Sequence, residues 1–154
     1  MIALRRAAEA DYLTLHRMQV TCFLPLLEKY HDDAISPAAE PPERMLARLR
    51  EPITDYYFIV HDGADIGAVR IISRGTVRVI KQLYILPEHQ GKGLGQAAIA
   101  AVEARYPDTT RWELDTIAEE AKLCHLYEKM GYLRVGIVMT VHDGMHIVGY
   151  AKNA

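Results

Sequence analysis

The stretch from Leu83 to Gln96 constrains the fold of this chain more than any other. It starts with an apolar run that ends at Pro87, passes through a short polar turn, and then alternates three glycines, Gly91, Gly93 and Gly95, with other residues. In the segment after it, apolar residues at positions 94, 97, 98, 101 and 102 share one face of an α-helix. The pattern predicts a strand, a glycine-rich loop and a helix. Free backbone N–H groups at such a helix N-terminus favour a bound phosphate.

Length and composition indicate one globular domain over residues 1–154, since half of the residues are hydrophobic and 25% are charged. The net charge of −2 gives no sign of a nucleic-acid-binding surface. No apolar run approaches the roughly 18 residues that span a bilayer, and the N-terminal residues lack a signal-peptide pattern. We therefore expect a cytoplasmic protein without membrane contact.

The cysteines and histidines give no strong sign of a metal or redox centre. Cys22 and Cys124 both lie within apolar helical patterns, which favours reduced, buried thiols over a disulfide or a nucleophile. The histidines are scattered without the spacing of metal ligands, so we predict no metal.

Before the glycine loop, the pattern predicts a strand at 2–6, a helix at about 9–23 interrupted near Pro25, a long polar loop, and a helix at 42–50. Three strands joined by short turns follow at 55–61, 66–72 and 77–86, which predicts an antiparallel meander. The long loop is typical of a functional segment.

After the loop, we expect a helix at about 93–105, a strand at 111–116, a helix at about 119–130, and strands at 132–142 and 145–151. The strand at 111–116 follows a crossover helix and should lie parallel to the strand that enters the loop. The sequence thus predicts an α/β fold with a mixed sheet.

Two phosphate-binding templates fit the loop poorly. The P-loop pattern needs Ser or Thr after Gly-Lys, whereas Lys92 is followed by Gly93. The dinucleotide pattern requires GxGxxG, whereas this loop reads GxGxG. Its glycines also do not follow the strand directly, and the antiparallel meander before it is incompatible with a doubly wound sheet. A plain turn that uses glycine for positive φ is a further alternative.

The loop matches a third pattern, QxxGxG, at Gln90, Gly93 and Gly95. Together with HLYEKMGY at 125–132 and the order of elements, it resembles the GNAT (GCN5-related) N-acetyltransferase family over nearly the whole chain. The resemblance implies the acyl-CoA N-acyltransferase fold, in which a central parallel strand pair splays apart to admit the cofactor.

The resemblance also implies acetyl-CoA as the co-substrate. The residues expected to contact it are Leu83, Tyr84, Ile85, Gln90, Gly91, Lys92, Gly93, Leu94, Gly95 and Gln96. Tyr127 occupies the position of the family's general acid, which donates to the leaving thiolate; packing in the core is the alternative role.

The general base is not assigned by the motif, because Lys81 and Glu120 stand where many family members have glutamate and asparagine. Glu113 and Asp115 are candidates because they share one face of the strand beside the cofactor strand. The long loop adds Glu28, His31, Asp32 and Asp33 as candidate acceptor-binding groups or bases, and a water relay is a further option.

The sequence thus predicts an N-acetyltransferase that acts on a primary amine of a small molecule or peptide by direct attack in a ternary complex. A non-catalytic acyl-CoA binding or sensing module is the alternative. Exposed edges of the C-terminal hairpin favour a homodimer.

Overall fold

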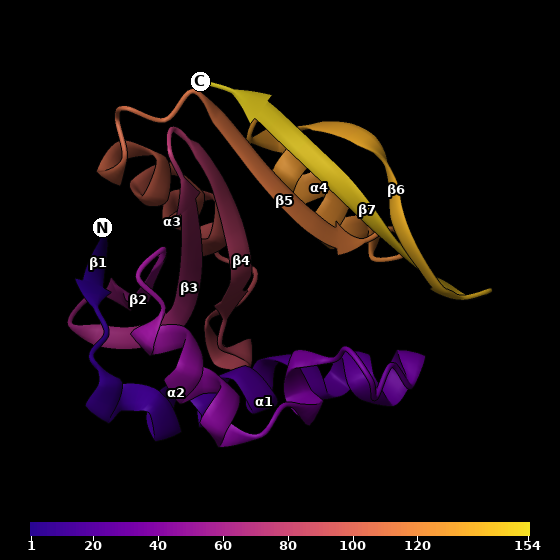
Figure 1. The fold of residues 1–154 in the computed structure, drawn as a ribbon, viewed down its shortest axis with the longest axis horizontal. Coiled ribbons are helices and arrows are strands. Elements are labelled where there is room, and N and C mark those ends of the chain that lie inside the picture. Colours follow the sequence, from indigo (N-terminus) through magenta and orange to yellow (C-terminus); the bar gives the residue numbers. More distant parts are fainter.

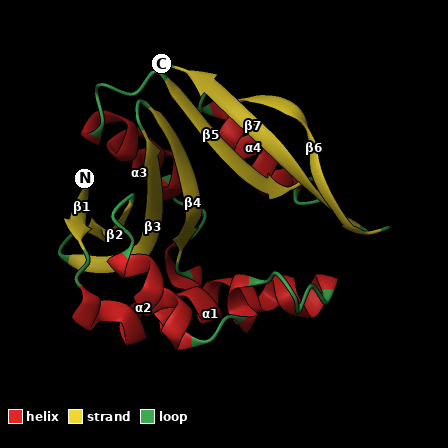
Figure 2. Ribbon diagram, in the orientation of Figure 1, coloured by secondary structure: helices red, strands yellow, loops and turns green.

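The computed structural model describes residues 1–154 and contains one mixed seven-stranded sheet flanked by helices (Figures 1 and 2). The strand order is β1-β2-β3-β4-β5-β7-β6. The strands are β1 (Ile2–Arg6), β2 (Thr54–His61), β3 (Ala64–Arg74), β4 (Val77–Ile85), β5 (Arg111–Ile117), β6 (Leu133–His142) and β7 (Met145–Asn153). The helices are α1 (Tyr12–Tyr30), α2 (Pro42–Arg50), α3 (Leu94–Arg105) and α4 (Ala121–Lys129). The predicted mixed sheet, with its meander β2-β3-β4, is confirmed.

Strands β4 and β5 form the one parallel pair of the sheet, as expected for strands joined by the crossover helix α3. Their ladder joins residues 77–80 to residues 111–114 and stops there. Both strands continue beyond this point, and Figure 1 shows them diverging. The splay between the central strands is therefore present.

The splay coincides with an irregularity in β4. Pairing with β3 shifts register between Ala68 and Arg70, and opposite this point Gln82 has a φ of 40°. Next to it, a Cβ on Gly67 would lie 2.0 Å from the carbonyl oxygen of Tyr84. Glycine is therefore required at position 67 for the close approach of the two strands.

Helices cover both faces of the sheet and create two apolar clusters. Helices α1 and α2 pack on one face, where Leu15 and Met45 meet Tyr56 and Phe58 of β2. The other face holds the larger cluster, in which α3 and α4 cover Trp112 and neighbouring strand residues. Apolar residues alternate along the strands and recur on one side of each helix, and these residues form the two buried faces.

Helix α1 differs from the prediction. It runs through Pro25 to Tyr30, whereas the sequence predicted an interruption near Pro25. A proline inside a helix removes one hydrogen bond and strains the preceding turn. Packing of Leu15 and Met18, upstream, and of Tyr30, downstream, outweighs that cost, because all three side chains are buried.

Strand β6 lies at the edge of the sheet and exposes an apolar surface. The exposed side chains are Leu133, Val135, Ile137, Val138 and Met139, with exposed fractions from 47% to 73%. Among the helices, none has the length and hydropathy needed to cross a membrane.

Candidate functional site

A cleft of about 820 Å³ opens where β4 and β5 diverge. One wall is the end of β4 with the glycine loop that follows, and the other is formed by β5 and α4. The segment from Cys22 on α1 to Pro37 closes one end. The two predicted motifs therefore meet in one cavity.

The glycine loop presents unpaired backbone donors to this cleft. Gly91 and Gly93 have φ values of 78° and 74°, and a Cβ on either would meet no atom within 4 Å. No N–H group from Gly91 through Gln96 donates to another backbone group, and the first bond of α3 comes from Ala97. Six free N–H groups next to open space suit an anionic ligand such as a pyrophosphate.

Other loop residues hold this geometry. The Gln90 side chain donates from Nε2 to the carbonyl oxygen of Ile85 at 2.8 Å, which ties the loop back to β4. A Cβ on Gly95 would lie 3.4 Å from Leu126, so this glycine allows α3 to approach α4. The side chain of Lys92 does not line the cleft.

The end of β4 exposes its unpaired edge to the cleft. Leu83, Tyr84 and Ile85 all line the cavity and lie beyond the last pair with β5. The hydroxyl of Tyr84 donates to the carbonyl oxygen of Leu15 at 3.3 Å, which fixes β4 against α1. The strand edge can accept an extended ligand as an added strand.

Tyr127 lies in the α4 wall with its ring buried. Its ring packs against Tyr132 and Tyr150, with centroids 6.2 and 6.3 Å away, and the residue lines the cleft. Burial, with a smaller contribution from Cys124, raises the pKa of Tyr127 to about 12. The hydroxyl therefore stays protonated at neutral pH and can act as a donor.

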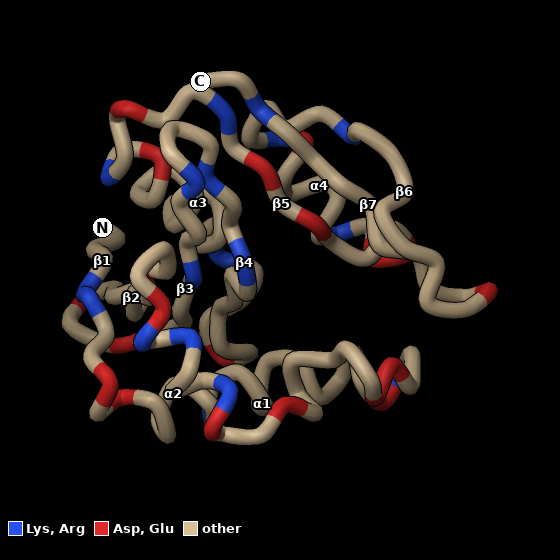
Figure 3. Tube along the Cα trace, in the orientation of Figure 1, with Lys and Arg blue, Asp and Glu red and all other residues tan.

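The two candidate bases on β5 have different surroundings. Glu113 pairs with Arg111 at 2.9 Å and does not line the cleft. Asp115, the first residue after the ladder ends, lines the cleft and forms no ion pair. On β4, Lys81 holds the equivalent place and lines the same cleft; Figure 3 shows the acidic positions on β5 and the basic ones on β4.

Of the four candidates in the predicted long loop, the structure brings one to the cleft. Asp32 is buried and lines the cavity. Glu28, His31 and Asp33 are exposed and do not line it. Glu28 lies within α1, because that helix continues past Pro25.

Glu120 takes part in a bridge across the end of the cleft that the sequence did not reveal. Its Oε2 accepts hydrogen bonds from Lys29 at 2.7 Å and the Tyr30 hydroxyl at 2.5 Å. Burial alone would raise the pKa of Glu120, but these two hydrogen bonds hold it below its ordinary value. The Tyr30 carbonyl also accepts from His142 at 2.7 Å, so the end of α1 is joined to α4 and to the tip of the β6–β7 hairpin. The partners are about 90 or more positions apart, so no local pattern predicts them.

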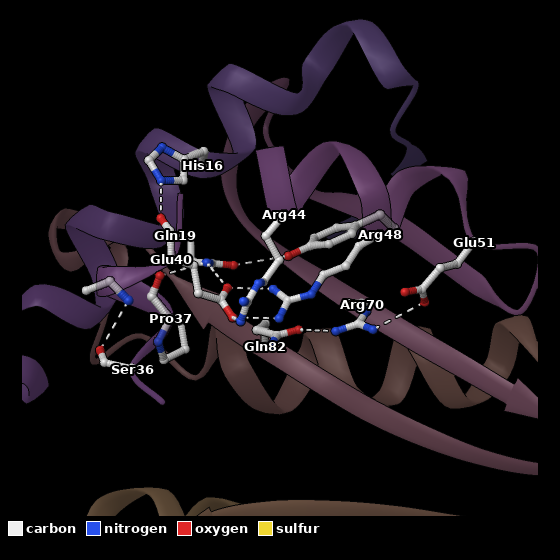
Figure 4. A network of polar contacts seen from close by, with 12 residues as sticks. His16, Gln19, Ser36, Pro37, Glu40, Arg44, Arg48, Glu51, Arg70 and Gln82 are labelled. Atoms are coloured by element: carbon white, nitrogen blue, oxygen red, sulfur yellow. Dashed lines mark hydrogen bonds and ion pairs between the residues drawn. The ribbon is translucent and has the colours of Figure 1, made fainter. Parts of the chain in front are cut away.

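A polar network behind β4 supports its irregularity (Figure 4). Arg70 donates to the Gln82 side chain at 3.2 Å and lies 3.5 Å from Glu51. Beside it, Arg48 binds Glu40 through two 2.6 Å hydrogen bonds. Burial, together with Arg48, lowers the pKa of Arg70. Through Arg70, the network connects Glu51, at the end of α2, to the strand that borders the cleft.

No group of three or more His, Cys, Asp or Glu side chains is arranged to hold a metal ion. Both cysteines are free; Cys124 is buried, whereas Cys22 is half-buried and lines the cleft. Burial, with a smaller contribution from Glu88, raises the pKa of the Cys22 thiol to about 12. Cys22 is therefore a poor nucleophile at neutral pH.

The family model described as "Acetyltransferase (GNAT) family" matches residues 14–132. The protein YrkN of Bacillus subtilis (strain 168), described as uncharacterized, is 34% identical over 94 residues. That alignment covers 59% of this chain and 51% of YrkN, so the chain spans about half the length of this curated relative.

Several solved structures share the fold. An acetyltransferase from Thermus thermophilus superposes with a TM-score of 0.76 at 16% identity, covering 100% of this chain and 97% of the other. The spermidine N-acetyltransferase from Vibrio cholerae, in complex with CoA and spermine, gives 0.77 at 18% identity, with 99% and 95% covered. An aminoglycoside acetyltransferase in complex with coenzyme A gives 0.74 at 21% identity, again with 99% and 95% covered. At these identities the likeness concerns the fold.

Proposed function

Because the chain belongs to the GNAT acetyltransferase family, we propose that it transfers the acetyl group of acetyl-CoA to a primary amine by direct attack in a ternary complex. The observation that carries the proposal is the row of six free backbone N–H groups from Gly91 through Gln96 beside the cleft. They would hold the pyrophosphate of the donor, and the free edge of β4 at Leu83 and Ile85 would pair with its pantetheine arm.

In the reaction, the amine nitrogen attacks the thioester carbonyl carbon. The new C–N bond forms, the C–S bond breaks, and the nitrogen loses one proton. The electron pair of the C–S bond leaves with sulfur as a thiolate. The chain must therefore provide a proton acceptor near the amine and a donor near the sulfur.

Tyr127 is the proposed donor to the sulfur. Its pKa of about 12 lies above the ordinary thiol value of about 8.5, so full proton transfer to the thiolate would cost about 5 kcal/mol. A hydrogen bond that strengthens as charge develops on sulfur avoids this cost. Tyr127 thus acts as a hydrogen-bond donor, and the thiolate is released or protonated from solvent.

Asp115 is the proposed proton acceptor, directly or through one water molecule. It is supported over Glu113 because it lines the cleft and is not paired with a cation. Lys81 lines the same cavity, and its positive charge lowers the pKa of a nearby substrate amine. This effect favours the neutral amine, which is the nucleophile.

We also propose that two copies of the chain associate through β6. The side chains of this edge strand include Ile137, with an exposed fraction of 67%, and Leu133, with an exposed fraction of 73%. An exposed edge with large apolar side chains favours pairing with another strand. A second copy provides an identical surface for a two-fold symmetric contact.

The proposed function is tested by incubating the protein with acetyl-CoA and a panel of amines that includes polyamines, amino acids, aminoglycosides and peptide N-termini. Release of free coenzyme A must equal formation of the N-acetyl product. Binding of acetyl-CoA without turnover on any amine would instead support an acyl-CoA sensing module.

A further inference from the structure

The end of the cleft beside α1 contains one buried carboxylate among apolar side chains. Asp32 has an exposed fraction of 7%. The same end is lined by Phe23, Leu26, Ile35 and Pro37. A carboxylate placed in such surroundings is costly unless a positive partner compensates it.

The chain supplies no partner to Asp32. Its Oδ1 is buried and makes no hydrogen bond. Glu120, the other acidic side chain at this end, is compensated by Lys29 and Tyr30. Buried polar atoms almost always have partners in folded proteins, and the two exceptions here are Asp32 Oδ1 and Arg70 Nε. Arg70 still contacts Gln82 and Glu51 through its other guanidinium nitrogens, whereas the carboxylate of Asp32 has no partner, which points to a ligand.

The backbone holds Asp32 firmly in this place. Its carbonyl oxygen accepts from the N–H groups of Ile35 at 3.0 Å and Ser36 at 2.8 Å. The following residues are anchored to α1, where Gln19 donates to the carbonyl of Pro37 at 2.8 Å. The carboxylate is therefore fixed before any ligand arrives, which reduces the entropy lost on binding.

We propose that Asp32 binds a second positive charge on the acceptor, so that the substrate is an aliphatic diamine or polyamine. This inference rests on the proposed function. The reacting amine would lie near Asp115 and the remote ammonium near Asp32, with Phe23 and Leu26 contacting the methylene groups between them. Acceptors with a carboxylate at the remote end are disfavoured by charge repulsion with Asp32.

The test compares α,ω-diamines of increasing length with monoamines of equal carbon number. The wild-type protein is expected to have a kcat/KM about 10- to 100-fold higher for the best diamine, the range expected for a hydrogen bond between two charged groups. Asp32→Asn should abolish this preference by raising the KM for the diamine. Asp33→Asn, an exposed neighbour outside the cleft, is the matched control and should behave as wild type.

Equal efficiency with diamines and monoamines, or a preference that survives Asp32→Asn, would overturn the inference. Thermal melting adds an independent readout, because removing an unpaired buried charge should leave the melting temperature at or above that of wild type.

If acetyl-CoA binds but no amine is acetylated, the proposed function fails, and calorimetry of the diamine with the protein saturated with coenzyme A decides the inference. Diamine binding that weakens in Asp32→Asn supports it, whereas absence of diamine binding overturns it.

Discussion

At the scale of single residues, the proposed chemistry depends most on Tyr127. Tyr127→Phe preserves the ring that packs on Tyr132 and Tyr150 and removes only the hydroxyl. We expect kcat to fall about 100-fold, a typical contribution of one hydrogen-bond donor to charge that develops in the transition state. Affinity for acetyl-CoA, measured by calorimetry, should stay within a few-fold. A variant with the wild-type kcat would remove Tyr127 from the mechanism.

The pH dependence of the rate tests the role of Lys81. Its positive charge disfavours the protonated amine, so Lys81→Met should raise the pKa of the bound amine. The neutral nucleophile then forms at higher pH, and the acidic limb of the kcat profile should move up by about half a unit to one unit. Arg74→Met, which removes the same charge from an exposed position outside the cleft, is the control and should leave the limb in place.

The sequence predicted which residue types meet at the site, but it could not choose between near neighbours. Strand alternation puts Glu113 and Asp115 on one face, as the burial of Trp112 and Leu114 on the other face confirms. The ion pair of Glu113 with Arg111 and the position where the ladder with β4 ends separate them, and the second of these is a long-range property. Asp32 was likewise one of four candidates until the fold of the α1–α2 segment buried it.

At the scale of elements, the glycine loop is the part that local sequence determines best. Gly93→Val should weaken acetyl-CoA binding about tenfold or more, since the added side chain would project beside the free N–H groups and is strained at positive φ. Gly75→Val is the matched control, with a φ of 64° and open space around it in the β3–β4 turn. Equal losses of affinity in both folded variants would contradict the loop assignment.

Two elements could not be predicted because tertiary packing decides them. Helix α1 continues through Pro25, since it has buried side chains on both sides of the proline. The irregularity at Gln82 is accompanied by the close approach at Gly67 and the hydrogen bond from Arg70, which come from the neighbouring strand β3. Neither the packing around Pro25 nor these contacts between strands can be predicted from a local sequence pattern.

At the scale of the whole molecule, the edge strand β6 bears on the oligomeric state. Sedimentation should show a mass of two chains for the wild type and of one chain for Ile137→Lys, because a charge on the exposed strand opposes pairing. Leu13→Lys is the control, as Leu13 is 52% exposed on α1. A wild-type protein that sediments as one chain at micromolar concentration would refute the dimer.

The cleft is lined by residues from the N-terminal part of the chain, between Cys22 and Pro37, and from its C-terminal half, between Ile80 and Ile147. The bridge from Tyr30 to Glu120 and His142 joins α1, α4 and the terminal hairpin at the proposed acceptor end. The proposed donor end is built by the loop and the two splayed strands. Two substrates entering from different ends would be bound together, as direct transfer requires.

Initial rates measured over a grid of acetyl-CoA and amine concentrations test this account most directly. Direct attack in a ternary complex predicts double-reciprocal lines that intersect, with one N-acetyl product formed per coenzyme A released. Parallel lines, which indicate an acetylated enzyme intermediate, or the absence of any amine-dependent rate would contradict it.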